Sequence, residues 1–292
     1  MTVGFLQAGQ RGLAAMALGV LALTAGAATV HAAPVQLKPS LLRLNANLEL
    51  PPGKKVSDGV ALILHGTQSH YRQETIAALQ QNLKKHGIGS LAITLSLGID
   101  DREGPRDCQA LHDYALAGTR REVALWMAWL RAEGARTIDL IGFSRGGAQI
   151  AALAPNLTPV KHVVLMAPAF ATAAEQAEAY QRAFGHPLGP VLDEAKKQPL
   201  QKFTVDFLLC RQAPVLGATI LDAYQELLPQ LAAETGHPTL VVIAGKDESV
   251  PDLATRLPSQ VHRVVIDGAG HFFPDLYGED AADAIAKFLK TE

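Results

Sequence analysis

Short apolar runs alternate along this chain with longer stretches in which apolar residues recur every three or four positions. The first pattern is typical of strands buried on both faces, and the second is typical of amphipathic helices. We interpret these segments as strands: residues 41–50, 59–64, 90–95, 137–141, 160–166, 239–244 and 261–266. Because strands and helices alternate, the sequence predicts an α/β fold in which helices flank a mostly parallel sheet of about seven strands.

The interval between two of these strands is unusually long. About seventy residues separate residues 160–166 from residues 239–244, far more than one crossover connection requires. Helical periodicity fills this interval in three stretches, residues 171–184, 188–197 and 219–233, with Gly-His-Pro and Gln-Pro breaks. We therefore expect one α/β domain with a helical cap insertion over about residues 169–237.

A short glycine-rich motif joins a predicted strand to a predicted helix. Residues 142–146 read Gly-Phe-Ser-Arg-Gly, between the strand at 137–141 and a helical stretch at 148–153. A serine on so tight a turn crowds its neighbours, so the positions two before and two after it must be nearly free of side chains, and Gly142 and Gly146 are. The pentapeptide alone would arise by chance in about one such chain in ten. Its position makes it a specific signal for a nucleophile elbow at Ser144.

A serine hydroxyl becomes a good nucleophile only beside a base that a third group holds in place. Asp247 follows the strand at 239–244, and His271 follows the strand at 261–266 within Asp-Gly-Ala-Gly-His. Six of the other histidines occur in helical, loop or strand contexts without glycine-flanked exposure: His86, His112, His162, His186, His237 and His262. Glu248 and Asp267 are the rivals of Asp247, but Asp267 lies only four residues from His271 and is better suited to capping the turn.

The motif and the chain order Ser, Asp, His resemble the α/β-hydrolase superfamily of serine hydrolases from about residue 41 to the C-terminus. The resemblance implies that Ser144 is the nucleophile, that His271 is the general base and acid, and that Asp247 orients the histidine. It also implies that the backbone N–H groups of Thr67 and Arg145 bind the oxyanion.

The assignment of Thr67 depends on the segment His65-Gly66-Thr67, which follows the strand at 59–64 and resembles the His-Gly loop of these hydrolases. The alternative is an ordinary glycine turn with His65 as a packing residue. The position of the loop relative to Ser144 favours the oxyanion assignment.

We therefore expect a serine hydrolase that cleaves an ester, or a thioester or amide, through an acyl-enzyme. A serine peptidase of the same fold is one alternative, and a non-catalytic binding protein that keeps the fold is another.

Composition limits the other possibilities. A hydrophobic content of 48% supports a substantial core, and a formal net charge of −2 leaves no basic stripe for nucleic acid or for an anionic membrane. Neither metal-ligand spacing nor a glycine-rich phosphate loop occurs in the sequence. We expect no cofactor and no metal, a small ester-type substrate, and no evident protein partner.

The N-terminal residues have the pattern of a signal peptide. Arg11 precedes an apolar run over residues 12–23, and Val-His-Ala at 30–32 is a small-residue site suited to cleavage. We expect residues 1–32 to be removed and residues 33–292 to be exported to a bacterial periplasm or secreted, without stable membrane insertion. The alternative is a retained membrane anchor, since residues 12–30 approach the length that spans a bilayer.

Export bears on the two cysteines of the chain. An even count in an oxidising compartment favours a disulfide between Cys108 and Cys210. Two buried free thiols are the alternative.

Overall fold

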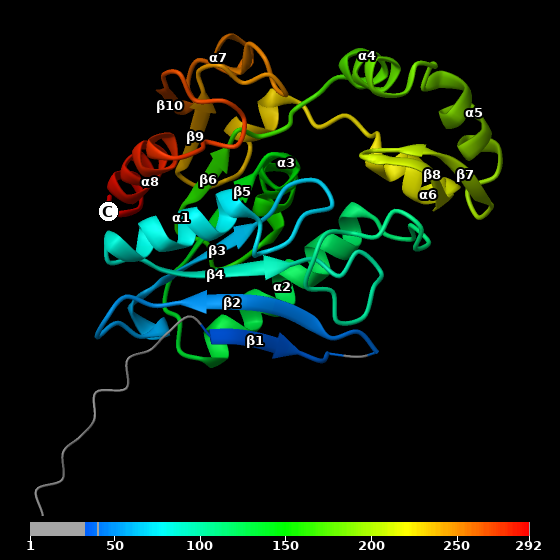
Figure 1. The fold of residues 1–292 in the computed structure, drawn as a ribbon. Coiled ribbons are helices and arrows are strands. Elements are labelled where there is room, and N and C mark those ends of the chain that lie inside the picture. The colour runs from blue at the N-terminus through cyan, green and yellow to red at the C-terminus, as the bar shows by residue number, and fades with distance from the viewer. Residues whose placement is uncertain (1–32, 40, 292) are drawn as a thin grey trace, which may run out of the picture.

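The central feature of the structure is one mixed sheet. The computed structural model describes residues 33–39 and 41–291, so the predicted signal peptide at residues 1–32 lies outside the described residues. Eight strands form the sheet in the order β1-β2-β4-β3-β5-β6-β9-β10 (Figure 1). Their bounds are β1 (Ala33–Leu37), β2 (Leu44–Glu49), β3 (Val60–Leu64), β4 (Gly89–Thr94), β5 (Ile138–Phe143), β6 (Val163–Met166), β9 (Thr239–Ala244) and β10 (His262–Ile266). β2 pairs antiparallel with β1 and β4, and all the other neighbours are parallel.

Helices cover both faces of this sheet. One face carries α1 (Glu74–Lys85) and α8 (Leu276–Leu289), and the other carries α2 (Leu116–Ala132) and α3 (Arg145–Leu153) (Figure 1). Short 3-10 turns occur at Val56–Asp58 and Ala154–Asn156. Among the described helices, none is both long and apolar enough to cross a membrane. The mostly parallel sheet expected from the sequence is therefore present, with helices on both of its faces.

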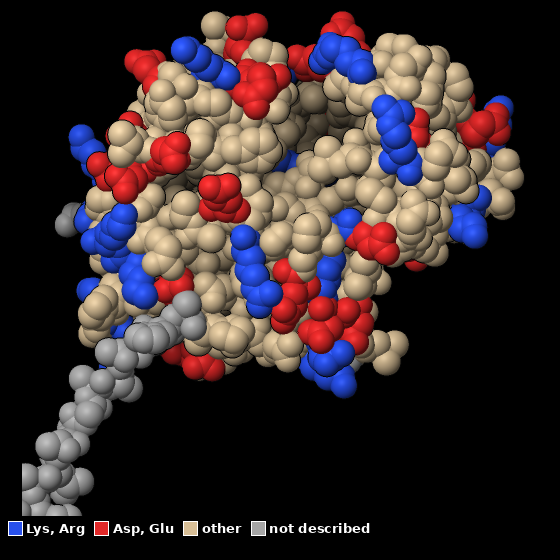
Figure 2. Space-filling view, viewed as in Figure 1, with Lys and Arg blue, Asp and Glu red and all other residues tan. Residues whose placement is uncertain are grey.

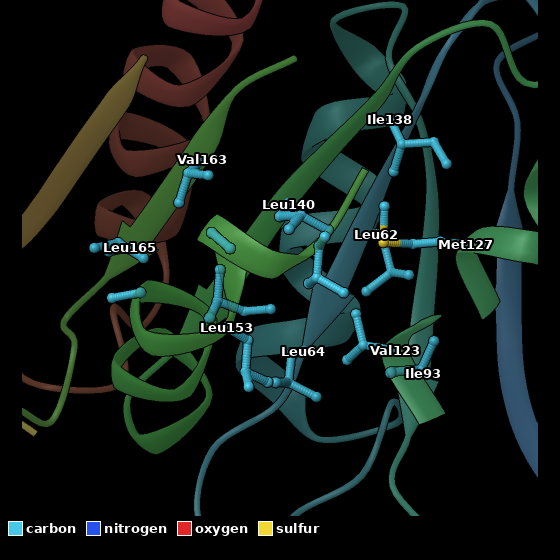
Figure 3. Close-up of a cluster of buried hydrophobic side chains, with 14 of the residues drawn as sticks. Leu62, Leu64, Ile93, Val123, Met127, Ile138, Leu140, Leu153, Val163 and Leu165 are labelled. Carbon is cyan, nitrogen blue, oxygen red and sulfur yellow. The ribbon is translucent and has the colours of Figure 1, made fainter. Parts of the chain in front are cut away.

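The central strands are apolar at successive positions because both of their faces are covered. Along β3, Leu62 and Leu64 belong to the cluster that includes Val123 of α2 and Leu153 of α3 (Figure 3). Ile63 points to the opposite cluster, against α1 and α8. This packing gives a rigid sheet whose carboxyl edge can hold loops in fixed positions.

The sheet has one strand more than the sequence analysis predicted. β1 is the addition, and it pairs only with β2 at the edge of the sheet. Its side chains alternate between exposed and half-buried positions, and five such residues beside a predicted cleavage site give a weak periodic signal. The strand expected at 41–50 is also shorter in the structure, where it covers Leu44–Glu49.

The long interval between β6 and β9 forms an insertion, which we define as residues 167–238. It contains α4 (Ala173–Phe184), α5 (Gly189–Lys197), β7 (Lys202–Phe207), β8 (Cys210–Leu216), α6 (Gly217–Ala223) and a 3-10 turn at Pro229–Ala233. The helices expected at 171–184 and 188–197 are present as α4 and α5, but the insertion is not helical throughout, because β7 and β8 form an antiparallel hairpin. The helix expected at 219–233 is also two separate elements.

The hairpin has a physical cause in the sequence. Phe203, Val205 and Phe207 alternate with polar residues, which is the period of a strand with one covered face. These side chains contribute to a separate apolar cluster of the insertion, in which Phe207 and Ile220 are fully buried.

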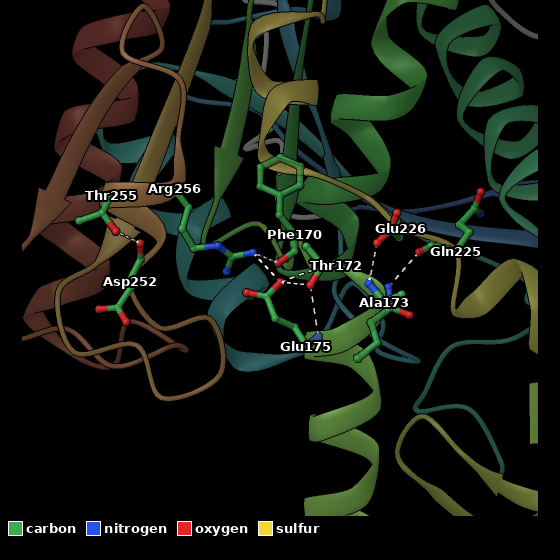
Figure 4. A network of polar contacts seen from close by, with 10 residues as sticks. Phe170, Thr172, Ala173, Glu175, Gln225, Glu226, Asp252, Thr255 and Arg256 are labelled. Carbon is green, nitrogen blue, oxygen red and sulfur yellow. Dashed lines mark hydrogen bonds and ion pairs between the residues drawn. The ribbon is translucent and has the colours of Figure 1, made fainter. Parts of the chain in front are cut away.

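Polar contacts fix the two ends of the insertion (Figure 4). Arg256, at the end of α7 (Leu253–Arg256), donates from Nη2 to the Phe170 carbonyl oxygen at 3.2 Å and to Glu175 Oε2 at 2.9 Å. The Ala173 N–H donates to Glu226 Oε1 at 2.7 Å. The entering and leaving segments are thereby joined to each other and to the loop that follows β9.

The expected disulfide between Cys108 and Cys210 is present. Cys108 lies in the loop between β4 and α2, and Cys210 begins β8. The same loop is hydrogen-bonded to β8 through His112, whose N–H donates to the Pro214 carbonyl oxygen at 2.8 Å. The hairpin of the insertion is therefore held against the loop that follows β4 by both covalent and backbone contacts.

Candidate active site

The predicted nucleophile, Ser144, lies on the turn between β5 and α3. Its backbone has φ 54° and ψ −122°, a strained conformation for a residue with a side chain. Backbone hydrogen bonds hold it there: the Ser144 N–H donates to Met166 in β6 at 2.9 Å, and the Ser144 carbonyl accepts from Gly147 and Ala169 at 2.9 Å each. The strain is thus maintained by the neighbouring strand and by the first turn of the helix.

The glycines around Ser144 are required by contact distances. A Cβ on Gly142 would overlap the carbonyl oxygen of Gly146, and a Cβ on Gly146 would overlap the carbonyl oxygen of His65. Backbone atoms on both sides cannot move away without disrupting β3 and β5. The sequence argument for small residues at these two positions therefore has a direct steric basis.

The structure brings Ser144, His271 and Asp247 together at the carboxyl edge of the sheet. His271 Nε2 lies 2.9 Å from Ser144 Oγ, and His271 Nδ1 lies 2.9 and 3.0 Å from the two carboxylate oxygens of Asp247. A carboxylate only accepts, so Nδ1 carries the proton and Nε2 is free to accept from the serine hydroxyl.

The surroundings of Asp247 keep it ionised. Burial alone would raise the pKa of its carboxyl, but hydrogen bonds from His271 and from the Val250 and Ser249 amides hold that pKa below its ordinary value. The two amides donate to Oδ1 at 2.8 Å each. Asp247 is therefore a fixed acceptor for the histidine ring.

The two rival acids occupy other positions. Glu248 Oε2 accepts from the backbone N–H of His271 at 3.2 Å, so it contacts the main chain and not the ring. Asp267 is exposed at the turn after β10. Within the described residues, the hydrogen bonds of the His271 ring go to Asp247 and Ser144, and Asp267 makes none with it. Two phenylalanines enclose the ring, with Phe143 at 5.3 Å and Phe272 at 5.2 Å between ring centroids.

The two predicted oxyanion donors, Thr67 and Arg145, belong to two segments that adjoin Ser144. Arg145 follows it at the first position of α3, and Gly66 of the loop after β3 is so close that an added Cβ would stand 3.2 Å from the Ser144 Cβ. Within the described residues, the N–H groups of Thr67 and Arg145 make no backbone or side-chain hydrogen bond. Both are therefore available to an oxygen placed beside Ser144.

His65 stabilises the loop that carries Thr67. Its Nε2 accepts from the Leu95 N–H at 3.1 Å, so its Nδ1 holds the proton and donates to the Gly66 carbonyl oxygen at 2.8 Å. Burial, together with the nearby Arg102 guanidinium, lowers the pKa of His65 to about 3. The imidazole is thus neutral, and it fixes the orientation of the peptide that precedes Thr67.

A hollow opens between the insertion and the core, and uncharged residues form most of its visible wall (Figure 2). One cavity there has a volume of about 290 Å³ and is lined by Arg145, Ala169, Tyr180, Leu208 and Tyr224, among others. Ala169 is the residue whose N–H binds the Ser144 carbonyl, so this cavity adjoins the serine turn.

Apart from Arg145, sequence reasoning missed the residues of this wall. Leu208 and Tyr224 come from the insertion, and the Leu208 N–H donates to the Tyr224 hydroxyl at 3.0 Å. Burial raises the pKa of Tyr224 to about 12, so it stays a neutral phenol. The unusual backbone at Leu208, with φ 56°, marks the hairpin turn, and only the alternating pattern of residues 203–207 could have indicated it.

Comparisons with known proteins agree with this architecture. The model of the alpha/beta hydrolase family matches residues 61–288. The chain therefore belongs to the alpha/beta hydrolase family. Among curated proteins, no sequence matches it.

Several solved structures share the fold at low identity. Est1E from Butyrivibrio proteoclasticus, in a structure with ferulic acid bound, has a TM-score of 0.66 and 20% identity over 87% of this chain and 97% of its own. The alpha/beta hydrolase GrgF from Penicillium sp. sh18 has a TM-score of 0.63 and 15% identity over 89% and 98% of the two chains. The Pyrococcus furiosus esterase Pf2001 has a TM-score of 0.55 and 17% identity over 89% and 90%.

Proposed function

We propose that this chain is a serine hydrolase that cleaves a carboxylic ester through an acyl-enzyme. The observation that carries the proposal is the continuous hydrogen-bonded series from Ser144 Oγ through the His271 ring to Asp247. Such a series activates a hydroxyl that is otherwise a poor nucleophile. Belonging to the alpha/beta hydrolase family supports the assignment, and so do the esterases among the structures of similar fold.

The proposed reaction has two halves. Ser144 Oγ attacks the ester carbonyl carbon while its proton passes to His271 Nε2, and the carbonyl oxygen becomes an oxyanion between the N–H groups of Thr67 and Arg145. The C–O bond to the alcohol then breaks, and His271 returns the proton to the departing alcohol. In the second half, water attacks the acyl-serine, gives its proton to His271, and the acid leaves as Ser144 regains its hydrogen.

The insertion is proposed to act as a cap that shapes the substrate pocket, since its residues Leu208 and Tyr224 line the same cavity as Arg145, the residue that follows Ser144. We further propose that the protein acts after export. The disulfide between Cys108 and Cys210 supports this, because such bonds persist mainly in oxidising compartments.

Labelling with a fluorophosphonate tests the proposed chemistry. The folded wild-type chain should gain one adduct, and peptide mass mapping should place it on Ser144. Ser144→Ala should lose the adduct and all ester turnover, while Ser249→Ala, which removes an exposed hydroxyl from the loop of Asp247, should retain both. An unlabelled wild-type chain with a normal unfolding transition would overturn the proposal.

A further inference from the structure

The side chain of Arg145 has an unusual environment. Its guanidinium offers five N–H donors, yet within the described residues it makes one hydrogen bond, from Nη2 to the Ala223 carbonyl oxygen at 2.9 Å. Ala223 belongs to α6 of the insertion, so the side chain extends from the serine turn across to the cap. The other four N–H groups of the guanidinium are therefore available to bind a ligand.

Two other arginines of this chain bond through all three nitrogens of the guanidinium. Arg102 donates to the carbonyl oxygens of Leu95 and Gly104 at 2.7 and 2.6 Å and contacts His65. Arg263 likewise donates to three carbonyl oxygens. Arg145 differs from Arg102 and Arg263, because within the described residues its Nε and Nη1 have no hydrogen-bond partner.

The charge of Arg145 is also unbalanced. Burial lowers its pKa, and among the described residues no carboxylate forms an ion pair with it. The carboxylate that acts on it electrostatically is that of Asp222, whose Oδ2 already accepts from the Leu116 N–H at 2.8 Å. A half-buried cation without an ion-pair partner loses part of its hydration, and an anionic ligand would offset that cost.

Arg145 adjoins two spaces beside the serine turn. Arg145, Leu208 and Ala223 line both the cavity of about 290 Å³ and a narrow space that reaches Gly66 and Gln68 of the oxyanion loop. The rest of the larger cavity is mainly alanine and aromatic side chains. An apolar cavity with one open cation suits a small organic anion.

We propose that the Arg145 guanidinium binds a carboxylate of the substrate, so that the preferred substrates are small esters that carry one ionised carboxylate in addition to the ester group. The inference rests on the proposed ester hydrolysis and adds a substrate class to it. The planar guanidinium matches a carboxylate in a two-point contact, and the alanine and aromatic walls accommodate the apolar part of the ester. The backbone N–H of Arg145 and its side chain then serve two different oxygens of one substrate.

Two matched pairs of esters test this substrate class. Methyl hydrogen glutarate against methyl valerate places the carboxylate on the acyl side, and 3-acetoxybenzoate against phenyl acetate places it on the alcohol side. In at least one pair the wild-type chain should have the higher kcat/KM for the charged ester. Arg145→Gln should lower the ratio of kcat/KM for the charged ester to kcat/KM for the neutral ester of that pair by about 10- to 100-fold. This range corresponds to the contribution of a hydrogen bond to a charged group.

The ratio isolates the side chain, because the oxyanion N–H is kept in Arg145→Gln and acts on both esters of a pair. Arg182→Gln is the matched control, since it removes an arginine from the exposed surface of α4 and should leave the ratio unchanged. Arg145→Lys keeps the charge without the two-point contact and should lower the ratio less than Arg145→Gln. It also provides the test if Arg145→Gln does not fold.

Equal or lower kcat/KM for the charged ester in both pairs would overturn the inference, and so would a ratio that Arg145→Gln leaves unchanged. Hydrolysis of phenyl acetate and labelling of Ser144 would meanwhile show that the proposed function stands. If no ester is cleaved, calorimetry on the Ser144→Ala chain decides: 3-acetoxybenzoate should bind, phenyl acetate should bind more weakly, and Arg145→Gln should remove the difference. Absence of that difference would refute the inference independently of catalysis.

Discussion

Replacing Asp247 by asparagine changes one atom of the candidate site and leaves its shape. In the native chain, Asp247 Oδ1 accepts from the amides of Ser249 and Val250, while Oδ2 lies 2.9 Å from His271 Nδ1. The two amides require an acceptor, so the asparagine oxygen should stay on them. Its NH₂ group must then face Nδ1.

The imidazole responds by changing its tautomer. Nδ1 becomes the acceptor for the asparagine NH₂, and the ring proton moves to Nε2, which lies 2.9 Å from Ser144 Oγ. In this form the histidine cannot accept the serine proton, and it has no carboxylate to stabilise an imidazolium. We expect kcat to fall roughly 10⁴-fold, which corresponds to about 5 kcal/mol, with little change in KM.

Steady-state kinetics on phenyl acetate, beside a thermal unfolding curve for each variant, measures the effect. Glu248→Gln is the control, because its side chain contacts only the backbone N–H of His271 and its loss should reduce kcat by less than tenfold. A larger loss of kcat in Glu248→Gln than in Asp247→Asn would refute the assignment of the acid. So would an Asp247→Asn chain that keeps a tenth of the native rate.

The remaining predictions concern stability. Reduction of the disulfide between Cys108 and Cys210, which are 102 positions apart in the sequence, should lower the free energy of unfolding by about 2–4 kcal/mol, and the melting temperature of a double serine variant should no longer respond to reductant. Gly146→Ala should cost about 2 kcal/mol or more in denaturant unfolding, because its Cβ would overlap backbone, whereas Gly104→Ala, with open space around the Cβ, should change stability by less than about 0.5 kcal/mol. Between pH 6.5 and about 3, His65 is protonated in the unfolded chain and neutral in the native one, so acidification through this window should destabilise the fold by up to about 1.4 kcal/mol per pH unit. His65→Gln should flatten that dependence, and an unchanged slope would contradict the burial argument.

Local signals were sufficient for the part of the site that lies on the sheet. The elbow around Ser144 is one strand, one turn and one helix. The carbonyl oxygen of Gly146, four residues further on, excludes a side chain at Gly142, whereas the atoms that exclude one at Gly146 belong to His65 and Leu64, far away in the sequence. Asp247 and His271 each follow a continuous apolar strand, and parallel strands bring their carboxyl ends to one edge. The sequence therefore predicted which side chains the structure would bring together, without any knowledge of the long-range contacts between them.

The side chain of Arg145 shows where such reasoning stops. Its sequence neighbours fix its backbone N–H beside Ser144, but the partner of its guanidinium is the Ala223 carbonyl, 78 residues further along the chain. That contact exists only because α6 follows a hairpin, and the hairpin is held against the core loop by Cys108 and Cys210. The sheet thus positions the backbone of Arg145, while the insertion shapes the pocket around its side chain. Substrate preference should accordingly respond to changes in the insertion, while the geometry of Ser144, His271 and Asp247 should not.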